Sequence, residues 1–274
     1  MLERRFIQCD VFSETPFMGN GLAVVLDADG LSDRQMQDFA AWTNLSETTY
    51  LLPPSDPQAD YRLRIFTPTQ ELAFAGHPTL GSCAAWLHAG GTSRDGKTVV
   101  QQCKIGNVVI DISGTLPGFV APPTRISPMP QTVQDRILSA LGIDPQALRS
   151  AAILDNGSVW HLLEFDTATT IMAVTAARVT ALPGLGIGLM APRAPDAPSQ
   201  FDIRMLSERT SRYEDPITGS LNADQGRLRQ PTVMAQGAKV GRDGQVHLLP
   251  RPDGSGQVLV AGRSHIVIDG KVRI

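Results

Sequence analysis

The chain has few cysteines, and none of them is placed for a disulfide framework or a redox motif. Only Cys9, Cys83 and Cys103 occur among its 274 residues, and no two of them form a Cys-x-x-Cys pair. An odd number of widely spaced thiols favours a reducing compartment. We therefore expect a cytoplasmic protein.

Long apolar runs and a strong excess of one charge are also missing. The most apolar stretch, residues 179–190, is short and interrupted by Pro183 and three glycines, so it is not expected to cross a membrane. The start, Met-Leu-Glu-Arg-Arg, leads into a strand pattern and predicts no signal peptide. A net charge of −3 gives no electrostatic reason to expect nucleic acid or an anionic membrane as a partner.

Patterns that bind metals or nucleotides are weak or missing. The five histidines, at positions 77, 88, 161, 247 and 265, show no His-x-His or His-Glu-x-x-His spacing, so we expect no metal. Gly184-x-Gly186-x-Gly188 resembles a nucleotide loop, but no helical pattern follows before Pro192. We interpret that segment as a loop or strand and expect no cofactor.

What the chain does contain is an internal repeat. Residues 77–82 (His-Pro-Thr-Leu-Gly-Ser) and 215–220 (Asp-Pro-Ile-Thr-Gly-Ser) share a polar residue followed by Pro-x-x-Gly-Ser, and they lie 215 − 77 = 138 positions apart. With 20 Pro, 25 Gly and 17 Ser, chance predicts only about 0.1 copies of Pro-x-x-Gly-Ser. A long-period repeat indicates a duplicated domain with two equivalent sites. Each proline suits the first position of a helix.

The pattern along the chain predicts runs of strands with a few helices, which is typical of an α+β fold. Helices are expected at about 32–42, 76–88, 131–141 and 167–178, and from Pro216 onward. Strands are expected at 6–12, 22–26, 48–52, 61–67, 98–104, 108–112, 159–165, 201–206, 246–249, 258–261 and 265–268. We expect Asp-Gly turns at Asp243, Asp253 and Asp269, and a linker in the proline-rich segment 117–130.

Both copies of the repeat place a polar side chain at an expected helix start. Free N–H groups and the helix dipole favour an anion there, such as a carboxylate. His77 at the cap has the chemistry to bind or exchange a proton with that anion. The alternative is that His77 and Asp215 only cap their helices.

Glu47 lies in a third segment, residues 44–50, between an expected helix end and an apolar strand. Partial desolvation there would raise the pKa of its carboxyl group and suit it to move protons near neutral pH. The alternative is that Glu47 is solvated and has no catalytic role.

Seven ordered motifs together resemble one family. They are Asp10-Val11-Phe12, Pro16-Phe17-x-Gly19-Asn20, Leu31-Ser32-Asp33, Asn44-Leu45-Ser46-Glu47-Thr48, Arg64-Ile65-Phe66-Thr67-Pro68, Phe74-Ala75-Gly76-His77-Pro78-Thr79 and Glu214-Asp215-Pro216-x-Thr218-Gly219-Ser220. The chain resembles the phenazine-biosynthesis PhzF-like family, a branch of the diaminopimelate epimerase superfamily, from about residue 6 to residue 222.

The resemblance implies two similar domains, each a β-barrel-like sheet around a central helix, with an active cleft between them. We expect them at residues 1–116 and 117–263, with the last strand, about 264–274, packing back on the first domain. The resemblance also implies a homodimer and a cofactor-independent proton shift on a small carboxylate-bearing substrate, with Glu47 as acid and base. The implied remainder of the site is His77 and Asp215, which relay protons, with Ser46, Gly76, Gly219 and Ser220 binding substrate.

Two departures from the family pattern stand out. Gly21 occupies a position where the family usually has proline. The second central helix should be apolar all round if a sheet wraps it, yet its sequence continues with Asp224, Gln225 and Arg227.

Three other functions fit parts of the sequence. A racemase or epimerase with two facing cysteines is disfavoured, because none of the three cysteines falls in a site motif. Ser220, His77 and Asp215 supply the residue types of a hydrolase triad, but no Gly-x-Ser-x-Gly elbow is present. A non-catalytic protein that binds small molecules is the third possibility, and the presence of Glu47 favours chemistry over it.

Overall fold

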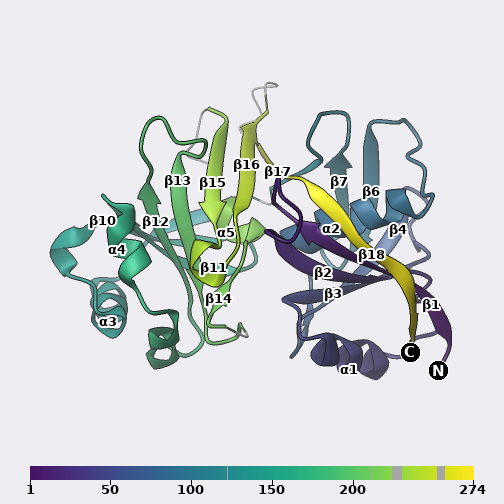
Figure 1. The fold of residues 1–274 in the computed structure, drawn as a ribbon, viewed down its shortest axis with the longest axis horizontal. Coiled ribbons are helices and arrows are strands. Elements are labelled where there is room, and N and C mark those ends of the chain that lie inside the picture. Colours follow the sequence, from purple (N-terminus) through teal and green to yellow (C-terminus); the bar gives the residue numbers. More distant parts are fainter. Residues whose placement is uncertain (122, 211, 224–229, 252–256) are drawn as a thin grey trace. The chain divides into compact units, whose positions relative to one another are not determined.

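A computed structural model describes the chain except residues 122, 211, 224–229 and 252–256. The chain divides into two compact units, residues 1–120 with 260–274 (unit 1) and residues 121–259 (unit 2) (Figure 1). Among the described residues, no helix has the length and apolar character needed to cross a bilayer.

Unit 1 is a curved sheet around one helix. Its elements are β1 (Glu3–Val11), β2 (Asn20–Val25), α1 (Asp33–Thr43), β3 (Glu47–Leu52), β4 (Tyr61–Phe66), β5 (Glu71–Leu72), α2 (Gly76–His88), β6 (Thr98–Cys103), β7 (Gly106–Asp111), β8 (Gly118–Val120) and β18 (Ser264–Arg273). Hydrogen bonds join the strands in the order β18-β1-β2-β3-β4-β6-β7-β8, with β2–β3 and β4–β6 parallel. Helix α2 contacts β1, β2, β3, β6, β8 and β18, so the sheet encloses it (Figure 1).

The sequence of α2 suits this enclosure. A helix buried on most of its surface must be apolar or small all round, and nine of its residues are buried, from Gly76 to Ala85. At Gly81 a Cβ atom would lie 2.6 Å from Leu22 and 2.8 Å from Val11. Glycine at this position therefore lets the helix backbone lie directly on strands β1 and β2.

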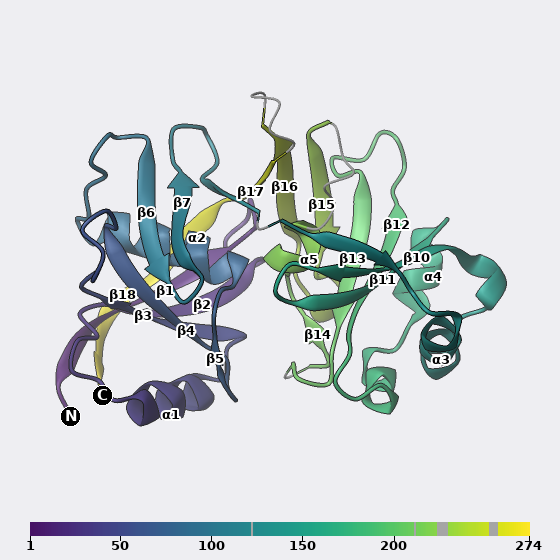
Figure 2. The ribbon, with the colours of Figure 1, turned by 180° about the vertical axis from the view of Figure 1, so that it is seen from behind.

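Unit 2 repeats the same pairing scheme. Its elements are β9 (Arg125–Pro128), α3 (Gln131–Leu141), η1 (Pro145–Ala147), β10 (Leu148–Asp155), β11 (Val159–Phe165), α4 (Ala168–Ala173), η2 (Ala176–Ala181), β12 (Gly186–Pro192), β13 (Phe201–Leu206), β14 (Glu214–Asp215), α5 (Gly219–Ala223), β15 (Thr232–Gln236), η3 (Ala238–Val240) and β16 (Gly244–Pro250), while β17 (Val258–Ala261) spans the boundary at residues 259 and 260. The order β9-β10-β11-β12-β13-β15-β16 matches β18-β1-β2-β3-β4-β6-β7 in direction at every pair. Figure 2 labels strands β10 to β16 of this unit. The duplication that the repeat predicted is confirmed, as is the α+β class.

Each unit also contains the same ion pair. Arg64 on β4 holds both carboxylate oxygens of Glu71 on β5, at 2.8 and 2.9 Å. Arg204 on β13 holds both carboxylate oxygens of Glu214 on β14, at 3.0 and 2.6 Å. In each unit the glutamate pairs across the sheet with the residue two positions after the arginine. Glu71 pairs with Phe66, and Glu214 pairs with Leu206. A bidentate pair fixes the short strand on its neighbour.

Several expected elements are found where the sequence placed them. The helices at 76–88 and 131–141 are α2 and α3. Helix α1 begins with a capping box, in which Ser32 accepts from the Gln35 amide and the Gln35 side chain accepts from the Ser32 amide. Gly186 and Gly188 belong to strand β12, which agrees with the interpretation of the Gly184–Gly188 segment as a loop or strand.

Two expectations near the ends of the sheets are wrong. Asp269-Gly270 is not a turn, because β18 continues through it in register with β1, and Arg5 and His88 bind the Asp269 carboxylate. The 117–130 segment is not a plain linker, because it contains strands β8 and β9. In both places strand pairing outweighs local turn chemistry. The expected turn at Asp253 lies outside the described residues.

Two expected helices are also wrong in extent. The helix expected at 167–178 breaks into α4 and η2, and at the break the carbonyl groups of Ile171 and Val174 accept hydrogen bonds from buried Arg204. The helix expected from Pro216 begins only at Gly219. Its polar continuation, Asp224, Gln225 and Arg227, lies outside the described residues.

Candidate active site

In unit 1 the structure brings Glu47 and His77 into contact. Glu47 is the first residue of β3, and His77 is the second residue of α2. His77 Nδ1 lies 3.2 Å from Glu47 Oε2, with side-chain exposures of 4% and 15%. Asn20 of β2 places its Nδ2 atom 3.5 Å from the same ring nitrogen. Three elements thus converge on one imidazole that is shielded from water.

The electrostatics make this imidazole neutral. Burial lowers the pKa of His77 from 6.5 to about 3, although an ionised Glu47 beside it acts in the opposite direction. The amide nitrogen of Asn20 can only donate, so its hydrogen bond makes Nδ1 the acceptor and places the ring hydrogen of the neutral imidazole on Nε2. Nε2 is therefore a hydrogen-bond donor.

His77 Nε2 is itself buried and has no hydrogen-bond partner within the part of the chain that the structure describes. A buried ring nitrogen without a partner is costly, so native proteins usually supply one. This atom is a candidate contact for a ligand that enters the site.

The start of α2 adds backbone donors beside His77. Its N-cap is Ala75, so the expectation that His77 caps the helix is wrong, and Pro78 is the third helical residue rather than the first. Thr79 N bonds to Ala75 O, which leaves the amides of Gly76 and His77 without an intrahelical acceptor. Such N–H groups and the helix dipole favour an anion.

A buried polar chain fixes this helix start. Tyr61 OH donates to Gln101 Oε1 at 3.2 Å, Gln101 Nε2 donates to Thr79 Oγ1 at 3.1 Å, and Thr79 Oγ1 donates to Ala75 O at 2.9 Å. Gln101 and Thr79 are fully buried. The sequence analysis quoted Asn20 and Thr79 within family motifs but named none of these residues as a candidate site residue. Gln101 follows two valines in β6, and that was the only local signal for it.

In unit 2 the candidates are Asp215, Gly219 and Ser220. Asp215 is not a helix cap, because it lies on β14 opposite Met205 and three residues intervene before α5. Thr218 Oγ1 donates to Asp215 Oδ2 at 2.6 Å. Gly219 is buried at the start of α5, and the carbonyl of Ser220 accepts from Asn156 Nδ2 at 3.0 Å. The candidates therefore fall into two groups. Those of unit 1 are half-buried Ser46 and Glu47, and buried Gly76 and His77.

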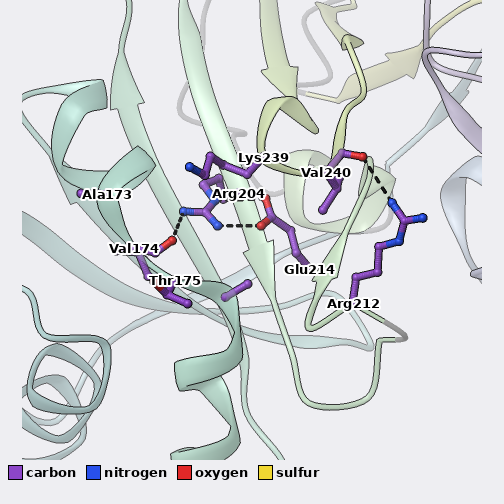
Figure 3. Close-up of a pocket in the computed structure, with 9 residues that line it drawn as sticks. Ala173, Val174, Thr175, Arg204, Arg212, Glu214, Lys239 and Val240 are labelled. Atoms are coloured by element: carbon purple, nitrogen blue, oxygen red, sulfur yellow. Dashed lines mark hydrogen bonds and ion pairs between the residues drawn. The ribbon is translucent and has the colours of Figure 1, made fainter.

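A hollow of about 490 Å³ in unit 2 contains none of these candidates. It is lined by Ala173, Val174, Thr175, Ala176, Arg204, Arg212, Glu214, Lys239 and Val240. The buried Arg204–Glu214 pair forms part of its wall, and Arg212 donates to Val240 O at 3.5 Å (Figure 3). Glu214 directly precedes Asp215, so the pair anchors the strand that carries this candidate.

Thiol and metal chemistry find no site among the described residues. Burial raises the pKa of the Cys9 and Cys83 thiols to about 12, which is unfavourable for a nucleophilic thiolate. The described residues hold no group of three or more His, Cys, Asp or Glu side chains with metal-binding geometry. Among the described residues, Glu47 and His77 form a carboxylate–imidazole contact that is shielded from water, whereas the His88–Asp269 contact is about 40% exposed.

The neutral state of His77 gives a test of the site's burial. Between pH 6.5 and about 3 the unfolded chain binds a proton at His77 that the folded chain does not. This residue alone then lowers the free energy of unfolding as the pH falls, by up to about 1.4 kcal/mol per pH unit. Urea unfolding of wild type and His77→Gln from pH 7 to pH 4.5 should show the steeper loss in wild type. Equal slopes would contradict a buried neutral imidazole.

Comparisons with known proteins agree on one family. The family model for phenazine biosynthesis-like proteins, PhzC-PhzF, matches residues 9–270. An uncharacterized isomerase of Mesorhizobium japonicum is 32% identical over 310 residues, covering 100% of both chains. Trans-2,3-dihydro-3-hydroxyanthranilate isomerase of Pseudomonas fluorescens is 29% identical over 293 residues, 96% of this chain and 99% of that one.

Two further matches differ in coverage. Antisense-enhancing sequence 1 of Schizosaccharomyces pombe is 41% identical over 180 residues, 63% of this chain and 61% of that protein. A crystal structure of a PhzF family protein from Bacillus anthracis aligns with a TM-score of 0.84 at 22% identity, covering 100% of both chains. The structural match confirms the fold that the sequence predicted.

Proposed function

The chain belongs to the PhzC-PhzF family of phenazine biosynthesis-like isomerases, and we propose that it moves a proton between two carbons of a small carboxylate-bearing substrate, with Glu47 as acid and base. The isomerase class is shown by the relatives that carry that name. The observation that carries the finer proposal is the contact between Glu47 and neutral His77 at a buried helix start.

The proposed reaction has two proton transfers. Ionised Glu47 takes a proton from one carbon, so that a C–H bond breaks and an O–H bond forms. It then returns this proton to another carbon on the same face of the substrate. A positioned general base of this kind contributes about 10²–10⁴-fold in rate.

The neighbouring groups suit a charged substrate. Amides of Gly76 and His77 at the start of α2 bind its carboxylate and stabilise charge that develops during the transfer. His77 Nε2 is a buried donor without a partner among the described residues, and it hydrogen-bonds the substrate. Ser46, beside Glu47, completes the binding groups of unit 1. The candidates of unit 2 are Asp215, to which we assign proton relay, and Gly219 and Ser220, to which we assign substrate binding.

A screen for solvent deuterium uptake tests the proposal. Cyclic and linear amino and hydroxy acids, with trans-2,3-dihydro-3-hydroxyanthranilate among them, are incubated with the protein in deuterated water and read by mass spectrometry. We expect incorporation at one carbon of at least one compound. Binding of these compounds without any incorporation would favour the alternative of a non-catalytic binding protein.

The hydrolase alternative makes a different prediction at Ser220. A fluorophosphonate probe labels activated serines, and Ser220 has no strand-to-helix elbow of the hydrolase type. Intact-mass measurement should therefore show no labelling above that of a Ser220→Ala variant. Stoichiometric labelling of Ser220 would overturn the isomerase assignment. Cofactor independence, a homodimer and a cytoplasmic location remain predictions.

A further inference from the structure

Gln236, the last residue of β15, connects the backbone and side chains around Asp215. Its Nε2 atom donates to Asp215 O at 3.1 Å and to Thr218 Oγ1 at 3.0 Å. Its Oε1 atom accepts from Thr218 N and from Asn222 Nδ2, each at 3.0 Å. The side chain is 97% buried, with 3% exposure, and each end of the amide makes two hydrogen bonds.

The neighbouring groups fix which way this amide points. Thr218 N–H can only donate and Asp215 O can only accept, so the amide oxygen faces the first and the amide nitrogen faces the second. Thr218 Oγ1 then receives a hydrogen bond from Gln236. A hydroxyl has a single proton, and at 2.6 Å the acceptor for it is Asp215 Oδ2.

We propose that Gln236 is a positioning residue for Asp215, acting through the hydroxyl of Thr218. By occupying the acceptor side of that hydroxyl, Gln236 directs its proton to Asp215 Oδ2. A hydrogen bond donated to a carboxylate favours its ionised form. The network therefore orients the Asp215 carboxyl group, and this inference rests on the proposed role of Asp215 in the reaction.

Packing alone does not account for these residues. An apolar side chain at this strand position would leave the Thr218 N–H and Asp215 C=O groups without these hydrogen bonds, and it would also leave the Thr218 hydroxyl without its donor. Asn222 is fully buried in the same network, and its Oδ1 atom has no partner among the described residues. Both buried amides bond to Thr218, whose hydroxyl donates to the Asp215 carboxylate, so the network reaches the acid through this one residue.

Two isosteric changes test the direction of the hydrogen bonds. Gln236→Glu replaces the donor Nε2 by an acceptor, so the Thr218 proton turns toward the new carboxylate and away from Asp215. Thr218→Val removes the hydroxyl, whereas Thr218→Ser keeps it. We expect Gln236→Glu and Thr218→Val to lower kcat for deuterium exchange by roughly ten- to a hundredfold, with KM changed less than about threefold and the acid limb of the pH–rate profile moved to higher pH.

The controls separate positioning from a structural role. Thr218→Ser should restore the wild-type profile, and Gln200→Glu should leave it unchanged, because Gln200 is exposed and only its oxygen bonds to β15. The double variant Gln236→Glu/Thr218→Val should lose no more than the larger single loss, since both changes remove one interaction. A wild-type profile in a folded Thr218→Val variant would overturn the proposal, even if Gln236→Glu does not fold.

A readout without substrate separates this proposal from the proposed function. The ¹³Cγ signal of Asp215 is followed by NMR through an acid titration of wild type, Thr218→Val and Thr218→Ser. We expect the midpoint to rise by about one pH unit or more in Thr218→Val alone. Identical midpoints in all three proteins would refute the Gln236–Thr218 arrangement. A shifted midpoint in a protein that exchanges no deuterium would instead refute the reaction and leave the arrangement standing.

Discussion

Replacement of Glu47 by glutamine is expected to lower deuterium exchange into substrate by about 10²–10⁴-fold while ligand affinity changes only a few-fold. An amide of the same shape keeps the contact with His77 Nδ1, 3.2 Å away in the wild type, but it neither takes nor returns a proton. Exchange is measured by mass spectrometry in deuterated water, and affinity by calorimetry with the same compound.

A matched surface change makes the Glu47→Gln result specific. Glu3→Gln removes a carboxylate that is 46% exposed and paired with Lys271, so exchange should stay at the wild-type rate. Wild-type exchange in Glu47→Gln would remove this residue from the mechanism. Loss of binding together with exchange would assign it to substrate binding instead.

Breaking the buried pair in unit 2 is expected to cause the largest loss of stability. Arg204→Met leaves Glu214, 1% exposed, as an uncompensated buried charge, and it removes donors from the carbonyl groups of Ile171 and Val174. Loss of one partner of a buried pair costs about 3–5 kcal/mol in the free energy of unfolding. Urea unfolding followed by circular dichroism measures this cost.

Two comparison variants show where the cost arises. Arg263→Met breaks a pair with Glu14 whose side chains are 46% and 44% exposed, and should cost at most about 1 kcal/mol. Arg204→Met/Glu214→Met removes both buried charges and should recover much of the loss. A double variant as unstable as Arg204→Met would show that packing, rather than the unpaired charge, sets the cost.

The sequence predicted the duplication and the main candidates, because both leave local signals. The repeated Pro-x-x-Gly-Ser pattern and the apolar α2 segment are readable without tertiary structure, and α2 was found with its bounds. The contact of Glu47 with His77 joins residues 30 positions apart (77 − 47), and only the resemblance to a family connected them. Asn20 and Gln236 were missed because their partners are distant in the chain.

Other misses share one physical cause, which is tertiary pairing that overrides local preference. Asp215 before a proline is a good cap by residue type, yet pairing with Met205 places it on a strand. Strand β10 was not foreseen, because its residues are mostly half-buried and its Ser150-Ala151-Ala152 segment shows no alternation of polar and apolar types. Helix α4 is shorter than predicted, and at its end buried Arg204 donates hydrogen bonds to the carbonyl groups of Ile171 and Val174.

The pairing of β1 with β18 dictates an order of events during synthesis. Glu3 on β1 lies opposite Arg273 on β18, and the ribosome synthesises β18 only after all of unit 2. Strand β1 therefore lacks this partner while unit 2 is being translated. Unit 2 is one uninterrupted segment and is free to acquire its structure while translation continues. Until β18 emerges, the edge of β1 stays open to chaperones and to neighbouring nascent chains. The unit that contains Glu47 and His77 therefore needs a strand translated after unit 2 before its sheet is complete.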